Sequence, residues 1–180
     1  MKDEFCKLLL STQRSAIENV VQQLEEMGFF EAPASRKDHL CYPGGLMEHS
    51  LNVYHMAILL AKDLHILRPE IRLQEDSIII AALLHDICKA KRYRKNADGT
   101  YEKNFSDFPV GHGEKSVIML LQWGLVLTKE EMLAIRWHMG PWQLPMHNEE
   151  QISDYVHAER NCPLMTLIHT ADTLASKIME

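Results

Sequence analysis

Apolar residues recur at steps of three and four along most of the chain, which is the spacing of helices that bury one face. The clearest such pattern lies at residues 46–64. Residues 74–89 differ because they are apolar nearly all round, which predicts a buried helix. Further amphipathic helices are predicted at residues 4–27, 114–123, 128–140 and 164–179. The chain is therefore expected to be an all-α bundle of about six or more helices.

Residues typical of caps and turns separate these segments. Thr128 and Glu131 form a capping box at the start of one helix. Pro163 is suited to the first turn of the last helix. Residues 31–45, with two prolines and a glycine pair, predict a loop. Asp98-Gly99 lies between two short polar and aromatic stretches and predicts a short β-hairpin, with little other sheet.

Length and composition predict one domain. The 180 residues suffice for a sizeable core, and no linker-like stretch divides them. We expect a single domain, residues 1–180, with an N-terminal helix and loop at 1–42 and the functional core at 43–180. No apolar run approaches the ~20 residues that cross a bilayer, and the first residues lack a signal-peptide pattern. A cytoplasmic protein without membrane contact is expected. The four scattered cysteines form no CxxC pair, which argues against a disulfide framework and a thiolate zinc site.

The pair His85-Asp86 directly follows the unbroken apolar run at residues 78–84. Because a helix this apolar is buried, both polar side chains enter an apolar interior. An unpaired buried carboxylate costs several kcal/mol or more. Asp86 must therefore meet a cation, a dense hydrogen-bond network or a metal ion. A metal ion is the simplest explanation if other ligands come from elsewhere in the chain.

Two other predicted helices carry such side chains on their inward stripes. His49 aligns with the apolar residues of 46–64, and Asp172 aligns with those of 164–179. A single inward His or Asp is more often a hydrogen-bonded core group, but three helices that each bury one favour a shared site. His112, which lies between two glycines, and His138, at a helix end, are further candidates.

The remaining histidines are assigned no chemistry. His169 is expected to be structural because helical spacing sets it off the stripe of Asp172. The others in polar stretches are expected at the surface: His55, His65, His147 and His157.

The series His49, then His85-Asp86, then Asp172 resembles the HD superfamily of metal-dependent phosphohydrolases. With His112 and His138 it resembles the H…HD…H…H…D variant, which holds two metal ions. Four stretches are most similar to the HD module of bacterial 3′-to-5′ exoribonucleases: Gly44-Gly45-Leu46-Met47-Glu48-His49-Ser50, Leu83-Leu84-His85-Asp86-Ile87, Gly111-His112 and Ile168-His169-Thr170-Ala171-Asp172.

The chain departs from those exoribonucleases in two respects. Cys88 stands where that family usually has glycine, and we find no counterpart of the nucleic-acid-binding domain that precedes the HD module. The second difference argues against RNA as the substrate.

The resemblance implies a hydrolase with a dinuclear metal site. The implied ligands of the first ion are His49, His85, Asp86 and Asp172. Those of the second are His112 and His138, with Asp86 bridging both ions as a catalytic residue. Imidazole nitrogens and carboxylate oxygens suit divalent Mn, Fe, Co, Ni, Zn or Mg. A metal-activated hydroxide would then attack the phosphorus of a phosphomonoester or phosphodiester.

A basic cluster follows His85-Asp86 and supplies candidates for phosphate binding. Lys89 resembles the lysine of the family's HD-x-x-K pattern and is predicted to be catalytic and substrate-binding, with Arg92 beside it. Lys115 and Arg136 are weaker substrate-binding candidates. The formal net charge of −6 argues against binding a long nucleic acid. A small phosphate compound such as a nucleotide is expected.

Two other functions use the same residues. Some HD-domain relatives hold two irons and act as oxygenases, and others are non-catalytic modules that sense nucleotides or bind partners. Metal-capable side chains at all six positions count against a non-catalytic module. Phosphoester hydrolysis is the leading hypothesis.

Overall fold

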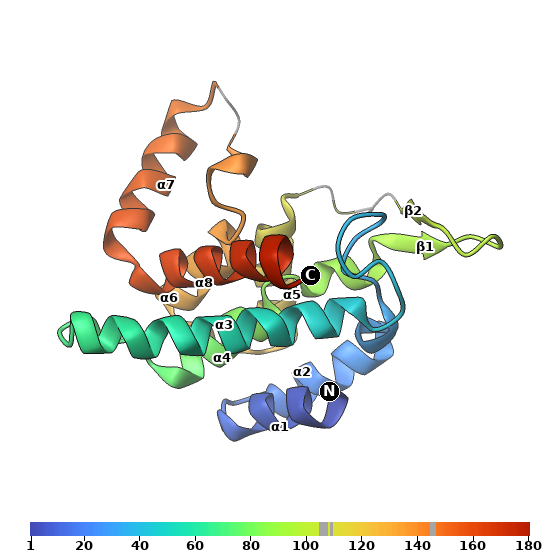
Figure 1. Ribbon diagram of the computed structural model, residues 1–180, viewed down its shortest axis with the longest axis horizontal. Coiled ribbons are helices and arrows are strands. Elements are labelled where there is room, and N and C mark those ends of the chain that lie inside the picture. The colour runs from blue at the N-terminus through green and yellow to red at the C-terminus, as the bar shows by residue number, and fades with distance from the viewer. Residues whose placement is uncertain (105–107, 109, 145–146) are drawn as a thin grey trace.

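The computed structural model describes residues 1–104, 108, 110–144 and 147–180, and it confirms the all-α prediction (Figure 1). The α-helices of the described residues are α1 (Lys2–Ser11), α2 (Ile17–Glu26), α3 (Gly45–Leu67), α4 (Glu75–Leu84), α5 (His112–Gln122), α6 (Lys129–Trp137), α7 (Glu149–Asn161) and α8 (Pro163–Leu174). Short 3₁₀ turns are η1 (Phe29–Glu31), η2 (Ile87–Lys91) and η3 (Gly140–Gln143), and a π-helical turn is η4 (Ala175–Met179). Strands β1 (Tyr93–Lys95) and β2 (Tyr101–Lys103) pair in antiparallel fashion.

Helix α4 lies at the centre of the bundle. All of its residues from 78 to 84 are buried, as the apolar run predicts. Helices α3, α6 and α8 pack against it, and α3 also packs along α8. Each fully buried Leu or Ile contributes about 1.5–3 kcal/mol relative to exposure. The polar residues that follow α4 are therefore carried into the buried interior of the bundle.

The predicted helix over residues 74–89 is wrong after Leu84. Helix α4 ends at Leu84, with His85 as its C-cap, and Asp86 leaves helical geometry with φ −114° and ψ 15°. The tighter turn η2 then begins at Ile87. This break changes the direction of the backbone between two adjacent polar residues, so that both side chains can face one point.

The N-terminal region forms two helices where the sequence pattern predicted one over residues 4–27. Between α1 and α2 the backbone turns through Gln13 and Ala16, which both have positive φ. Phe5 of α1 and Leu24 of α2 are fully buried in the common core. Arg14 of the turn pairs with the buried Glu131 at the start of α6, which fastens this region to the bundle. A continuous apolar stripe does not distinguish one helix from a hairpin of two.

Helix α7 lies in a polar stretch for which no helix was predicted. Asn148 caps it by accepting a hydrogen bond from the Gln151 N–H. Within α7, Tyr155 and Ala158 are its buried residues, so the apolar face is too narrow to be recognised as a stripe. In Figure 1 this helix stands away from the bundle and joins α8 at Cys162.

The predicted cap, first-turn proline and hairpin are confirmed, whereas the α-helices predicted at 128–140 and 164–179 end earlier, at Trp137 and Leu174. The Thr128–Glu131 capping box opens α6, and Pro163 is the first residue of α8. The hairpin pairs Tyr93 with Lys103, and Gly99 in its turn has φ +87°. No helix among the described residues is long and apolar enough to span a membrane.

Helix α5 lies directly against the backbone of α6 at Gly113. A Cβ atom there would lie 2.3 Å from the Arg136 carbonyl oxygen and 2.7 Å from that of Ile135. Backbone atoms cannot move aside as a flexible side chain can, so only glycine permits this approach. The contact sets the spacing between His112, next to Gly113, and His138 at the end of α6.

We therefore expect Gly113→Ala to lower the free energy of unfolding by about 1–3 kcal/mol, the usual cost of overpacking. Alanine is intrinsically the better helix former by about 1 kcal/mol. Without a steric conflict, Gly113→Ala would therefore raise the free energy of unfolding. Urea unfolding of the metal-free protein measures the difference. The control is Gln122→Ala at the exposed end of α5, which should change stability by less than about 0.5 kcal/mol. A Gly113→Ala variant as stable as the wild type would contradict the close contact.

Candidate metal centre

The structure brings the six predicted ligands into one cluster. They come from the start of α3, the junction between α4 and η2, the start of α5, the end of α6, and α8, and they are His49, His85, Asp86, His112, His138 and Asp172. His49, His85, Asp86 and His138 are buried, and the side chains of Asp172 and His112 are only 13% and 10% exposed. Residues separated by up to 123 positions thus meet inside the bundle, as the inward stripes predicted.

Asp86 lies in the middle of the cluster and faces two groups of imidazoles. Its Oδ2 atom lies 3.4 Å from His85 Nε2 and 3.9 Å from His49 Nε2. Its Oδ1 atom lies 3.4 Å from His138 Nε2 and 3.6 Å from His112 Nε2. One carboxylate therefore has a different set of nitrogens on each oxygen, which is the arrangement expected of a group that bridges two ions.

Asp172 lies next to the first group of imidazoles, those of His49 and His85; the second group is His112 and His138. Its Oδ1 atom lies 3.2 Å from His49 Nε2, and His49 Nε2 lies 3.3 Å from His85 Nε2. In the second group, His112 Nε2 and His138 Nε2 are 3.1 Å apart. An ion bound at about 2.0–2.2 Å to nitrogen and oxygen ligands holds neighbouring ligand atoms about 3–3.5 Å apart. The spacing of both groups fits a divalent ion.

Two of the histidines are oriented by the same kind of hydrogen bond at a helix C-terminus. His85 is the C-cap of α4, and His138 is the C-cap of α6. Each donates its Nδ1–H to the carbonyl three residues earlier, His85 to Ala82 (2.8 Å) and His138 to Ile135 (2.7 Å). The hydrogen bond satisfies a carbonyl that the helix end leaves free. It also leaves an unprotonated Nε2 turned towards Asp86, which is the form that binds a metal.

The electrostatics of Asp86 call for a cation. Neither carboxylate oxygen accepts a well-formed hydrogen bond from the described residues, although both are buried. The Lys89 ammonium lies 2.5 Å from Oδ2. Burial alone would raise the pKa of Asp86, but the positive charge of Lys89 and the neighbouring His85 hold that pKa well below its usual value. The carboxylate is thus ionised and incompletely satisfied, which fits a metal-binding residue.

The histidines differ in their affinity for a proton. Burial lowers the pKa of His49, but hydrogen bonds to Asp172 and Glu180 outweigh burial and raise it to about 9. Burial lowers the pKa of His112 to about 3 and also lowers the pKa of His85. Two rings are thus neutral at pH 7 and ready to bind a metal, whereas an ion that binds His49 through Nε2 must displace a proton.

Sequence reasoning missed the surroundings of His49. Both Glu180 oxygens lie 3.2 Å from His49 Nδ1. The His39 ring lies 5.2 Å from the His49 ring, centre to centre. His39 comes from the loop before α3, and Glu180 follows the π-helical turn η4. Neither belongs to a periodic apolar stripe, so the pattern that revealed the other residues carries no signal for these two.

His169 has the structural role expected of it. Its Nδ1–H donates to the His138 carbonyl (2.7 Å), and its ring fills the space beside Gly140, where a Cβ would lie 2.4 Å from the ring carbon Cε1. His169 thereby holds the chain just after the end of α6, next to a predicted ligand.

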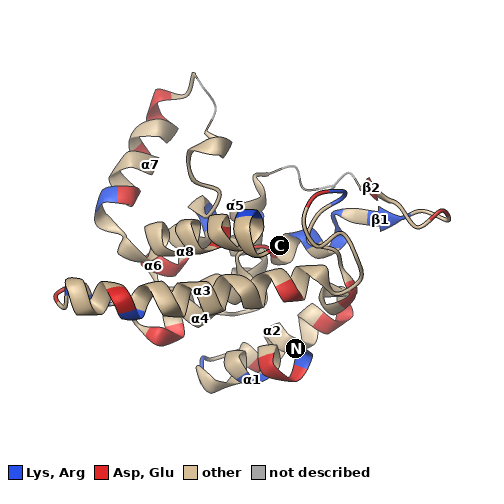
Figure 2. Ribbon diagram, in the orientation of Figure 1, with Lys and Arg blue, Asp and Glu red and all other residues tan. Residues whose placement is uncertain are grey.

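The predicted phosphate-binding residues have mixed surroundings. Figure 2 shows Lys and Arg along η2 and β1. Lys89 of η2 contacts Asp86, as described above, and Arg92 directly follows η2. Lys115, by contrast, donates to the Phe108 carbonyl (3.2 Å). Arg136 pairs with Glu114 at 3.0 Å and lies over the Trp137 ring. Lys89 and Arg92 therefore lie on the segment that directly follows Asp86. Lys115 and Arg136 instead bind Phe108 and Glu114.

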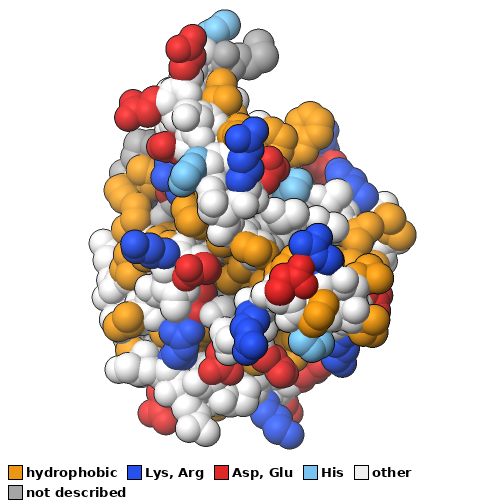
Figure 3. Space-filling view, turned by 90° about the vertical axis from the view of Figure 1, so that its left-hand side faces the viewer, with side chains coloured by type: hydrophobic (Ala, Val, Ile, Leu, Met, Phe, Trp, Pro, Cys, Tyr) orange, Lys and Arg blue, Asp and Glu red, His pale blue; other side chains and the backbone are white. Residues whose placement is uncertain are grey.

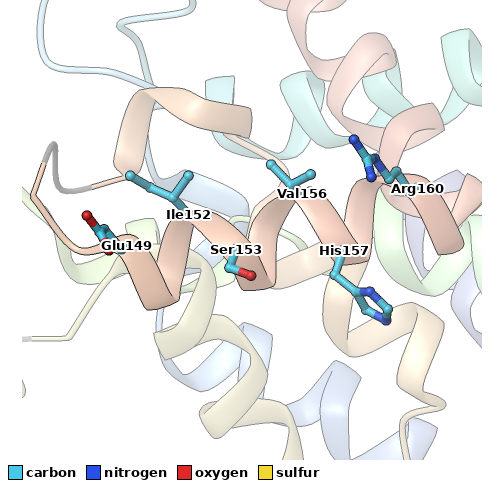
Figure 4. Close-up of a pocket in the computed structure, with 6 residues that line it drawn as sticks. All are labelled: Glu149, Ile152, Ser153, Val156, His157 and Arg160. Carbon is cyan, nitrogen blue, oxygen red and sulfur yellow. The ribbon is translucent and has the colours of Figure 1, made fainter.

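Two surface pockets lie apart from the cluster. One, of about 390 Å³, is lined by residues of α7, including His157, one of the histidines expected at the surface (Figure 4). The other, of about 580 Å³, lies between α5 and α6 and is lined in part by Arg136. None of the six predicted ligands lines either pocket, so neither changes the assignment of the site.

Comparison with known proteins identifies the family. The HD-domain family model matches residues 46–176, and the chain therefore belongs to the HD-domain family. Over 82 residues the chain is 39% identical to the dihydroneopterin 2′,3′-cyclic phosphate phosphodiesterase of Methanocaldococcus jannaschii. That match covers 46% of this chain and 32% of the relative, so it spans about a third of the curated protein. No solved structure gives a significant match.

If the two groups of nitrogens hold separate ions, the metal-loaded wild type should contain two divalent ions per chain. His138→Ala should then contain about one, because it removes a ligand of the second ion while His49, His85 and Asp172 remain. Metal analysis after reconstitution and desalting measures the ratio. His157→Ala, on the exposed side of α7, is the control and should retain two. One ion in the wild type and in the His138→Ala variant alike would show a single-ion site.

Proposed function

We propose that this protein is a metal-dependent phosphohydrolase that cleaves a phosphoester bond of a nucleotide or a similar small phosphate compound. The observation that carries the proposal is the buried Asp86 carboxylate, whose two oxygens face different pairs of imidazole nitrogens. Membership of the HD-domain family supports the same reaction class, as does the name of the partly similar archaeal phosphodiesterase.

In this proposal the six clustered side chains would hold the ions, and Asp86 would contribute to both groups of ligands. Bound divalent ions lower the pKa of water to about 7 and offset negative charge on a phosphoryl group. The protein supplies buried side chains that are held in place as ligands. Hydrogen bonds from His85 and His138 to helix carbonyls hold their rings in place before any ion or substrate arrives. No protein nucleophile is needed.

Lys89 is the proposed contact to the substrate phosphate. Burial lowers its pKa, but the charge of Asp86 outweighs burial and raises the pKa above its usual value. Lys89 thus carries a fixed positive charge at the edge of the cluster, with its side chain 13% exposed. Ions bound to Asp86 would take over the neutralisation of that carboxylate and leave the ammonium to a phosphate oxygen. Arg92, at the end of η2, would add a second positive charge.

The charge distribution favours a small substrate over a long nucleic acid. The chain has a formal net charge of −6, and acidic and basic side chains are interspersed over the face in Figure 3. A protein that follows a nucleic-acid backbone normally presents a broad basic surface. A small cyclic phosphodiester, the class named for the archaeal relative, is the first substrate to test.

Asp86→Ala should abolish hydrolysis, because the variant loses the group shared by both sets of ligands. Ions at a phosphoryl group contribute several kcal/mol to the transition state, so the rate should fall by about 10³-fold or more. Phosphate or monoester release from 2′,3′-cyclic nucleotides by the metal-loaded protein provides the measurement. Asp76→Ala, which removes an exposed carboxylate near the start of α4, should hydrolyse at the wild-type rate.

The same assay separates the other functions of the family. An anaerobically purified, iron-loaded sample that consumes O₂ but releases no product from cyclic or linear phosphoesters would indicate an oxygenase. A metal-loaded wild type without either activity would indicate a binding module. Near wild-type hydrolysis by Asp86→Ala would refute the assignment of the site.

A further inference from the structure

His49 differs from His85 and His138 in the partner of its Nδ1 atom. His85 and His138 donate Nδ1–H to neutral backbone carbonyls. His49 Nδ1 instead faces a carboxylate, with both oxygens of Glu180 at 3.2 Å. The ion-pairing side chains of both residues are only 1% exposed, so water cannot replace this contact easily.

We propose that Glu180 is a positioning residue of the metal centre, which holds His49 by its Nδ1–H and so presents Nε2 to the ion. Metal-binding histidines commonly donate the other ring N–H to a carboxylate or a carbonyl, which fixes the tautomer and ring orientation and makes the ligand nitrogen more basic. The charged acceptor also forms the stronger type of hydrogen bond. This inference rests on the proposed function, because it assumes that His49 is a ligand.

The surroundings of Glu180 hold its carboxylate in one place. Asn52, one turn after His49 on α3, donates its side-chain N–H to Glu180 Oε1 (3.0 Å). His39 Nε2 lies on the other side, 3.9 Å from Oε2. The carboxylate is thus tied to two residues of α3 and flanked by the loop that precedes this helix.

The end of α8 explains how Glu180 reaches α3. After Leu174 the helix widens into the π-helical turn η4, and the Glu180 N–H donates to the Ala175 carbonyl (3.1 Å). π-Helical turns are rare and occur frequently at functional sites. Here the turn follows Asp172, a predicted ligand, by three residues. One helix end therefore supplies both a ligand and the group that orients another ligand.

A separate ion held by His39, His49 and Glu180 is the other arrangement that these atoms allow, since they lie close enough to bind one. His49 would then bind ions through both nitrogens, which requires loss of both ring protons. A neutral imidazole keeps one N–H. A hydrogen bond from Nδ1 to Glu180, with Nε2 left for the ion, needs no such step.

The test compares zinc binding by the metal-free wild type, Glu180→Ala, Glu180→Gln and Glu48→Ala. Glu48 is the matched control, because it lies beside His49 in the chain but accepts its hydrogen bond from Tyr42. Loss of such a carboxylate typically weakens metal binding about 10- to 100-fold. Glu180→Ala should show this loss, Glu180→Gln should recover part of it by keeping an acceptor oxygen, and Glu48→Ala should match the wild type.

A second readout distinguishes positioning from general support of the fold. In ¹⁵N NMR spectra of the zinc-loaded wild type, His49 should be bound through Nε2 and show a protected Nδ1–H. In Glu180→Ala that proton should exchange rapidly with water, while circular dichroism stays unchanged.

Zinc binding of equal strength in the wild type and Glu180→Ala, with the Nδ1–H still protected, would overturn this inference and leave the proposed function intact. A third zinc ion per chain that is lost in Glu180→Ala would overturn it in favour of a separate site. A wild type that binds no zinc or other divalent ion would overturn the inference and the proposed function together.

Discussion

The ionised carboxylate of Asp86, buried at the end of an apolar helix, is the constraint on which the rest of the site depends. An isolated charge in such an interior is strongly unfavourable. Four imidazoles and the Lys89 ammonium surround it, yet neither oxygen receives a well-formed hydrogen bond from the described residues. A protein gains nothing in stability from this arrangement, since a well-packed apolar core is often more stable than a buried ion pair. The free-energy cost of burying this carboxylate is explained if the cluster binds metal ions for catalysis.

Helix ends build most of the centre. His85 and His138 cap the C-termini of α4 and α6, and His112 is the first residue of α5. At a helix end the chain changes direction, so a side chain can turn inward without displacing the packed face of the helix. The close contact at Gly113 then fixes the distance between two of these ends. His49 and Asp172 come instead from inward faces of α3 and α8, which pack against each other.

The sequence predicts the fold and the burial of three of the six clustered residues for one physical reason. A polar, metal-capable side chain within an apolar stripe is buried wherever the stripe is buried, so periodicity alone places His49, Asp86 and Asp172 inside. The departures arise where periodicity carries no information. It cannot locate the break after Leu84 or the turn between α1 and α2, and α7 buries too little to show a stripe. Glu180 follows a π-helical turn, which shifts it from the angle that regular helical spacing predicts.

Crystals grown with Zn²⁺ would reveal whether Asp86 and its imidazole neighbours bind a divalent ion. An anomalous difference map should show a peak about 2.0–2.2 Å from an Asp86 carboxylate oxygen and from at least two histidine Nε2 atoms. Lys89 should then have moved away from Asp86. A map without a peak at Asp86, in crystals whose solution contains saturating zinc and in which Lys89 still pairs with that carboxylate, would mean that Asp86 is not a metal ligand.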